Sequence, residues 1–408
     1  MSRLIAALTI LLTIACTKGA GAEDFSALTR VDSARSGISA AGSDGVALDL
    51  YLDFGVPWRL FMLDSPPRLV VDFREVDWSG VQAADLLKTD RIKGVQFGTY
   101  VPGWSRLVAE LGGPMGIETA ALKVEEATRN AHLAIRLKPV SKKVFAERSG
   151  APHDPRWDLP APAVVEAAPR RGPDDPLVVV LDPGHGGVDP GAETDVVDEK
   201  DLMLTFAREL REVLLRTGGF KVVLTREDDS FVSLERRVSI AHQAGADVFI
   251  SLHADSLAEG AAHGATVHML SRDASDEASA KMAERHDRAD LLAGMDLSET
   301  DDEVTGVLMD LARQETAPRT RALAEALVDG MAQTGGPMNR RPLRSAAFSV
   351  LKAADIPSVL IEIGFLSSPR DLSNLQNPEW RATMARGIRN GLAAWTQGDA
   401  AQRPLVRQ

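Results

Sequence analysis

The chain has 408 residues, of which 44% are hydrophobic and 25% charged, a composition typical of folded globular protein rather than of a disordered chain or a multi-span membrane protein. Lys and Arg number 46 against 58 Asp and Glu, so the formal net charge is −12. Nucleic-acid binders normally carry a basic face, and this charge argues against a nucleic-acid partner. The length predicts two or three domains of roughly 100 to 200 residues each.

The first 22 residues have the pattern of a secretory signal. Arg3 precedes an apolar run from Leu4 to Ala15 that is short for a bilayer span, and residues 20–22 form a small-residue cleavage site. We expect residues 1–22 to be removed on export to the periplasm, which would leave no stable transmembrane segment and no cysteine. An uncleaved anchor, or a lipid on Cys16, is the alternative.

Residues 27–145 contain short alternating runs that predict a small all-β, sandwich-like domain. The clearest of these strands span residues 46–52, 68–73, 105–111 and 131–137. Residues 146–176 follow with seven prolines and little hydrophobic periodicity, which is typical of a semi-extended linker.

From Leu177 onward, strands and helices alternate. The apolar run 177–181 is typical of a strand buried on both faces of a parallel sheet. Further strands are expected at residues 220–224, 246–252, 265–270 and 358–361, and helices at 202–214, 233–244, 317–334 and 378–396. The pattern predicts an α/β domain over residues 177–398, with a mostly parallel sheet flanked by helices and functional groups at the carboxyl ends of its strands.

Two histidines and two glutamates stand where such groups are expected. His185 and His253 follow strands, Glu199 opens a helix, and Glu362 ends an apolar strand. Taken singly, each histidine could be a hydrogen-bonded surface group and Glu199 a helix-terminal carboxylate. Glu362 must be paired, protonated or functional in such an apolar setting. Two imidazoles and a carboxylate at one sheet edge suit a catalytic zinc site with an open position for water.

The other five histidines outside the insertion described below lack such settings, and we interpret them as structural or solvated. They are His132, His153, His242, His263 and His268.

The motifs around these residues resemble, in order, those of the zinc-dependent N-acetylmuramoyl-L-alanine amidases of the AmiA, AmiB and AmiC type. They are Leu181-Asp182-Pro183-Gly184-His185-Gly186-Gly187, Glu199-Lys200-Asp201, Thr225-Arg226, Ile250-Ser251-Leu252-His253-Ala254-Asp255 and Pro357-Ser358-Val359-Leu360-Ile361-Glu362-Ile363-Gly364-Phe365-Leu366. The resemblance covers residues 177–398. Residues 27–145 resemble, more weakly, the AMIN domain that precedes the catalytic domain in many such enzymes and is implied to bind peptidoglycan; a mere spacer is the alternative.

The resemblance implies that His185, Glu199 and His253 bind one Zn²⁺ ion and that Glu362 is the catalytic carboxylate. Zinc would polarise the lactyl amide carbonyl of N-acetylmuramic acid and acidify a bound water. Glu362 would take a proton from that water and pass it to the departing amine of L-alanine. The implied role is peptidoglycan cleavage during cell-wall remodelling and daughter-cell separation.

Residues 271–316 interrupt the alternation of strands and helices with a long, acidic, partly helical insertion. In the septal amidases that the chain resembles, the insertion is a regulatory helix whose Glu blocks the metal until a protein partner withdraws it. Here His286 stands in place of that Glu, and we hypothesise that His286 caps the zinc, with Glu284 as the fallback. A solvated excursion without function is the alternative.

Two other classes of function stay open on the sequence. One is a zinc peptidase that cuts within the stem peptide, because the ligand set alone would permit it. The other is a wall-binding protein with a vestigial α/β domain, although an intact set of four site residues argues against that.

Overall fold

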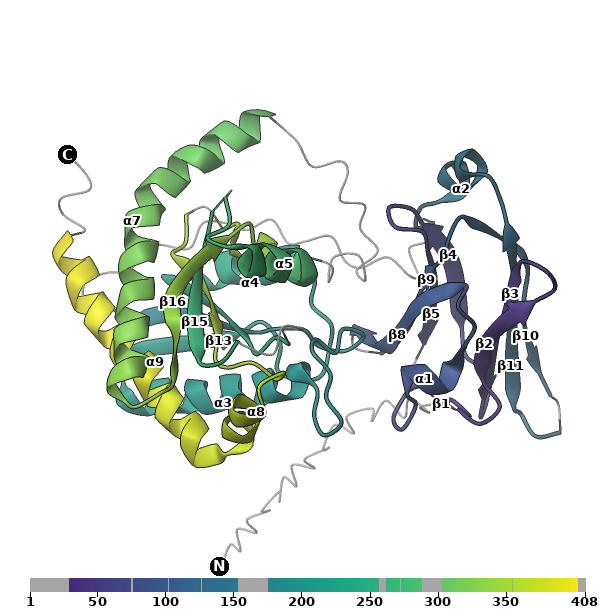
Figure 1. Ribbon diagram of the computed structural model, residues 1–408, viewed down its shortest axis with the longest axis horizontal. Coiled ribbons are helices and arrows are strands. Elements are labelled where there is room, and N and C mark those ends of the chain that lie inside the picture. The colour runs from purple at the N-terminus through teal and green to yellow at the C-terminus, as the bar shows by residue number, and fades with distance from the viewer. Residues whose placement is uncertain are drawn as a thin grey trace, which may run out of the picture.

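The computed structural model describes residues 29–152, 175–256, 262–287 and 303–402, except residues 75, 102, 126, 272 and 354. The predicted signal, residues 1–22, lies outside the described residues, as does most of the predicted linker. The described chain forms an all-β region followed by an α/β region (Figure 1). None of its described helices combines the length and apolarity that a bilayer crossing requires.

The all-β region consists of two larger sheets and a short strand pair, with strand orders β10-β11-β3-β2-β7, β4-β5-β9-β8 and β1-β6. The strands are β1 (Thr29–Arg30), β2 (Gly37–Ala41), β3 (Gly45–Leu52), β4 (Trp58–Leu63), β5 (Arg68–Arg74), β6 (Val76–Asp77), β7 (Leu87–Lys88), β8 (Ile92–Val101), β9 (Trp104–Leu111), β10 (Met115–Val124) and β11 (Ala131–Pro139). Two helices, α1 (Ala83–Leu86) and α2 (Lys142–Arg148), complete it.

The four strands expected here occur as β3, β5, β9 and β11, because their alternating side chains fill one core. Leu48 and Leu50 of β3 meet Phe73 of β5 and Leu133 of β11 in that core. β10 was not predicted, since most of its side chains are exposed or half-buried and give little apolar alternation. Helix α2, capped by the Ser141 hydroxyl, extends into the segment that the sequence assigned to the linker.

The α/β region has one six-stranded sheet with the order β13-β12-β14-β17-β15-β16. Its strands are β12 (Leu177–Pro183), β13 (Phe220–Leu224), β14 (Val248–His253), β15 (Ala265–Leu270), β16 (Met338–Ala346) and β17 (Ser358–Glu362). β12 is parallel to β13 and β14, and β14 to β17, whereas β15 runs antiparallel to β17 and parallel to β16. The sheet is therefore mixed. The sequence missed β16, a half-exposed edge strand rich in arginine.

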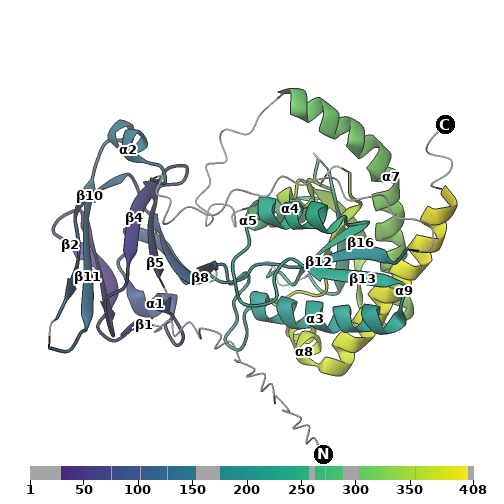
Figure 2. The same ribbon diagram turned by 180° about the vertical axis from the view of Figure 1, so that it is seen from behind.

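Helices cover both faces of this sheet (Figures 1 and 2). One core lies between the sheet and α3 (Glu199–Thr217), α7 (Glu303–Gln333), α8 (Pro369–Gln376) and α9 (Pro378–Gln402). A second core lies beneath α4 (Leu234–Ala244), α5 (Glu277–Asp287) and the short helix η1 (Ser349–Leu351).

Helix α7 corrects one predicted boundary. The sequence placed the end of the insertion at residue 316 and started a helix at 317, but α7 runs without a break from Glu303 to Gln333. Pro318 lies inside it. The second part of the insertion is thus continuous with a helix of the α/β core.

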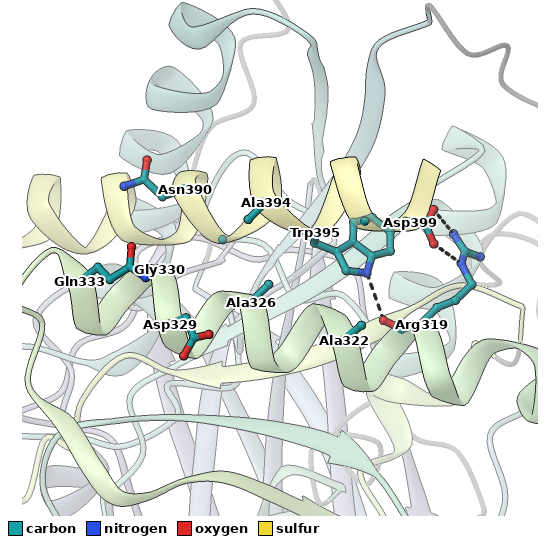
Figure 3. Close-up of a pocket in the computed structure, with 12 residues that line it drawn as sticks. Arg319, Ala322, Ala326, Asp329, Gly330, Gln333, Asn390, Ala394, Trp395 and Asp399 are labelled. Atoms are coloured by element: carbon teal, nitrogen blue, oxygen red, sulfur yellow. Dashed lines mark hydrogen bonds and ion pairs between the residues drawn. The ribbon is translucent and has the colours of Figure 1, made fainter. Parts of the chain in front are cut away.

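Glycines let α7 and α9 approach closely. A Cβ at Gly330 would collide with the backbone of Gly387, and one at Gly391 with the backbone of Leu327. A hollow of about 310 Å³ lies along this seam, and beside it the Trp395 indole donates to the carbonyl of Arg319 at 3.1 Å. Figure 3 shows the residues that line it. None of the predicted site residues lines it.

Candidate active site

The turn after β12 presents His185 in a left-handed backbone conformation, with φ +60°. This conformation is uncommon outside glycine and is often held by a functional site. Gly184 leaves room for the second histidine, because a Cβ there would collide with the imidazole of His253. The motif thus lets the His185 ring pack edge to face against the His253 ring at the end of β14, with ring centroids 4.9 Å apart.

Asp189 orients the His185 ring. Its Oδ2 lies 2.8 Å from Nδ1, which leaves Nε2 facing Glu199 Oε1 at 3.3 Å. This Nε2 is buried and has no hydrogen-bond partner. A carboxylate on one ring nitrogen and an unpartnered second nitrogen are typical of a histidine prepared to bind a metal. Burial alone would lower the pKa of His185, but Asp189 and Glu199 outweigh it and raise that pKa well above its usual value.

Glu199, at the first turn of α3, lies between the two imidazoles. Oε1 accepts the backbone N–H of Ala254 at 2.9 Å and lies 3.1 Å from Nδ1 of His253, while Oε2 accepts the N–H of Ala192. Burial would raise the pKa of Glu199, but the two imidazoles hold it well below its usual value. The side chain is thus kept as a charged carboxylate beside both rings, as a metal ligand must be.

Glu362 ends β17 and is paired in register with His253 at the end of β14. Its Oε2 accepts the backbone N–H of Asp255 at 2.9 Å, while Oε1 is buried without a hydrogen-bond partner. Burial, together with Asp255 and Glu199, raises the pKa of Glu362 well above its usual value. A buried carboxyl group with a raised pKa is a candidate for general acid–base catalysis.

The insertion brings His286 into the same cluster. His286 is on α5, is 5% exposed, and has its Nε2 3.6 Å from Glu362 Oε1. Its ring centroid lies 4.1 Å from that of His253 and 5.7 Å from that of His185. The fallback residue, Glu284, is exposed on the same helix and is not part of the cluster.

Sequence reasoning assigned no role to the residues that support the cluster. Arg285, beside His286, forms an ion pair with Asp255 at 2.5 Å. Arg237 contacts Asp182 at 2.6 Å and donates to the His185 carbonyl at 2.8 Å, so it ties α4 to the turn. Asp189 could have been suspected from its place four residues after His185, whereas Arg237 gave no signal in the sequence.

The residues fit a divalent metal. One potential ligand atom from each of His185, His253 and His286 lies within 4.8 Å of the others, and Glu199 contacts two of the three rings. Three buried atoms of the cluster lack a hydrogen-bond partner, namely His185 Nε2, His286 Nδ1 and Glu362 Oε1. Unpaired buried polar atoms are costly, and a bound ion with its water would satisfy them.

His268 is one of the five histidines that we interpreted as structural or solvated. It is buried beside Thr266, and burial lowers its pKa to about 3.

Comparison with known proteins identifies the family of the chain. Residues 179–394 match the family model described as N-acetylmuramoyl-L-alanine amidase. The chain is 30% identical to N-acetylmuramoyl-L-alanine amidase AmiC of Escherichia coli over 350 residues. This alignment covers 83% of each protein. The chain belongs to the N-acetylmuramoyl-L-alanine amidase family. AmiA of the same species is 37% identical over 220 residues, which cover 53% of this amidase and 75% of AmiA.

A solved amidase, AmiC2 of Nostoc punctiforme, is 28% identical, with a TM-score of 0.40 over 54% of this chain and 97% of that one. The family assignment made from the motifs is confirmed, and with it the activity: this amidase is a peptidoglycan hydrolase. The peptidase and the non-catalytic wall protein are left without support.

Proposed function

We propose that this amidase uses one zinc ion, held by His185, Glu199 and His253, to cleave the bond between N-acetylmuramic acid and L-alanine. The observation that carries the proposal is the convergence of these three side chains with Glu362 at neighbouring strand ends. Two imidazoles and one carboxylate suit zinc better than the harder divalent ions. Bound zinc would supply a Lewis acid for the amide carbonyl and for water.

Glu362 acts as the general base and then as the general acid. Its Oε1 is the buried oxygen without a partner, and its raised pKa favours proton uptake from an attacking water. The proton then passes to the amine of L-alanine as the C–N bond breaks. The Asp255 N–H, bound to Oε2, fixes the orientation of the carboxylate.

The insertion, residues 271–316, holds the enzyme inactive. His286 would compete with water for the ion, because one of its ring nitrogens lies within 4.8 Å of ligand atoms of His185 and His253, and its Nε2 lies 3.6 Å from Glu362 Oε1. The ion pair between Arg285 and Asp255 fastens α5 to the loop after β14. A protein activator that withdraws α5 would free both the metal position and Glu362.

The other parts of the chain deliver the enzyme to its substrate. Residues 1–22 direct export to the periplasm, residues 27–145 form an AMIN-like domain that binds peptidoglycan at the septum, and residues 146–176 link the two parts. The two-sheet structure of residues 29–139 supports this division, as does the match to AmiC over 350 residues.

Product mass tests the proposal. The zinc-loaded full chain, with His286→Ala to relieve inhibition, is incubated with purified sacculi beside the His286→Ala/Glu362→Gln variant. Deleting residues 274–312 is a poorer way to relieve inhibition, because α7 begins inside that segment. Stem peptides with a free L-alanine amine and glycan with bare lactyl carboxylates, absent from the double variant, are expected. Shortened stem peptides would contradict the bond assignment, and equal product from both variants would contradict the role of Glu362.

A further inference from the structure

The all-β region contacts the α/β region at the turn that carries His185. The backbone N–H of Val188 donates to the carbonyl of Thr99, near the end of β8, at 2.9 Å. Figures 1 and 2 both show β8 as the strand that reaches toward the α/β region. Val188 lies between the metal ligand His185 and its orienting carboxylate Asp189, so the contact acts on the segment that sets the ring position.

An apolar cluster includes Val188 and Tyr100, the neighbour of Thr99. Val188 is 0% exposed and Phe231 4%, and both pack against residues of the all-β region. The cluster consists of Phe61, Leu63, Val70, Tyr100, Val108, Val188 and Phe231. The rings of Tyr100 and Phe231 stack with centroids 5.7 Å apart. The cluster therefore joins buried side chains of both regions.

Tyr100 is itself held from within the all-β region. The guanidinium of Arg106 lies 3.6 Å from its ring centroid, and Arg106 is paired with Asp72 at 2.6 Å. Arg106 is only 2% exposed. A buried cation over an aromatic ring is among the stronger contacts of this kind, so Tyr100 presents a rigid surface to Phe231.

Two glycines let the backbones meet. A Cβ at Gly98 of β8 would lie 2.7 Å from the carbonyl oxygen of Gly187, and a Cβ at Gly187 would collide with the carbonyl of Thr99. Within the α/β region, the Asp229 carboxylate accepts the Gly187 N–H at 2.7 Å, and Lys200 Nζ donates to the Gly187 carbonyl at 3.0 Å. The turn is therefore held by the α/β region on one side and by β8 on the other.

We infer that the all-β region positions the catalytic centre: the end of β8, through Thr99 and Tyr100, holds the 185–189 turn in the geometry that binds metal. Thr99 and Tyr100 are positioning residues that act through Val188 and Phe231. The inference rests on the proposed role of His185 as a metal ligand. On this inference, the all-β region supports the active site in addition to its proposed role in binding peptidoglycan.

Strand β8 offers a matched pair of variants in the full chain. Gly98→Ala places a methyl group against Gly187, whereas Gly94→Ala on the same strand places it where no atom lies within 4 Å. We expect Gly98→Ala to weaken zinc binding about 10-fold, the effect of disturbing the support of a metal ligand. Gly94→Ala should change it by less than about 2-fold. Zinc affinity is measured by competition with a chromophoric chelator, which requires no amidase activity.

A kinetic measurement separates positioning from wall binding. In the His286→Ala background, Gly98→Ala should lower kcat for a soluble muropeptide and leave KM unchanged. Equal zinc affinity and equal kcat in the Gly98 and Gly94 variants would overturn the inference, even if both remain amidases. If the far-UV circular dichroism shows that Gly98→Ala is unfolded, a second pair of variants decides the same question. Tyr100→Leu removes the ring that stacks on Phe231, whereas Phe97→Leu removes a ring that packs on Trp78 instead.

Discussion

Glu362 and His286 face one another across the catalytic cluster, with Oε1 of the carboxylate 3.6 Å from Nε2 of the imidazole. One residue ends a core strand, and the other lies on a helix of the insertion. Burial and the nearby His253 and His185 hold the pKa of His286 well below its usual value, so the ring is neutral at physiological pH. A neutral imidazole is the form that binds a metal.

Replacement of Glu362 by Gln should separate chemistry from metal binding. The amide keeps the size of the side chain but cannot take a proton, so kcat should fall on the order of 10²- to 10⁴-fold. Zinc content, measured by atomic emission on the purified protein, should stay at one ion per chain, because Glu362 is not a proposed ligand. A variant that retains full activity would remove Glu362 from the mechanism.

Replacement of His185 by Ala should abolish tight zinc binding. The ring supplies one of the three proposed ligands, and Asp189 Oδ2 would lose the imidazole that it contacts. The matched control is His242→Ala, which removes an imidazole of α4 that is hydrogen-bonded to Asp355 at 2.8 Å and is not part of the catalytic cluster. Equilibrium dialysis against zinc should show loss in the first variant and retention in the second. Equal zinc binding in both would exclude His185 as a ligand.

His286→Ala should raise the basal activity, because it removes the group that faces both the metal position and Glu362. A gain on the order of 10-fold corresponds to a modest regulatory coupling free energy. Glu284→Ala, on the exposed face of the same helix, should leave the rate unchanged. Release of muropeptides from sacculi without an activator measures both. An unchanged rate for His286→Ala, or a gain limited to Glu284→Ala, would exclude the blocking role of the histidine.

Asp182 should make the stability of the α/β region depend on acid. Burial would raise its pKa, but Arg237, Ser251 and Thr225 outweigh burial and hold that pKa below the usual 3.8. The stabilisation is therefore complete above the unfolded pKa and is lost as the pH falls through the folded one. Urea unfolding of the metal-free protein, between pH 6 and pH 2, should show a free energy that drops at the acid end.

In Asp182→Asn, the buried Arg237 would lose its charged partner, so the protein should be less stable at pH 6 by roughly 3 to 5 kcal/mol. Its remaining stability should depend less on acid. Asp44→Asn, at an exposed turn of the all-β region, is the control and should follow the original chain. An Asp182→Asn protein with the same acid dependence as the original chain would refute the assignment.

Most of the strands found from the sequence are buried in a core, although β13 is largely half-buried. β14 and β17 are buried along their whole length and β12 at every residue except Val178, and their apolar runs are visible in the sequence. β10 and β16 were missed because their side chains are largely exposed or half-buried, so that solvent and not the core determines their composition. The start of α7 was predicted at residue 317 instead of Glu303, because residues 303–316 were assigned to the insertion.

The sequence by itself determined the family, the residue types of the site and their places at strand ends, since a short motif carries both the backbone turn and the ligand. Only the tertiary structure decided which face of α5 turns inward, putting His286 beside Glu362 and leaving Glu284 outside. It also decided that Thr99 meets Val188. These contacts join segments far apart in the chain, and they form because packing closes long loops, which no local pattern of residues encodes.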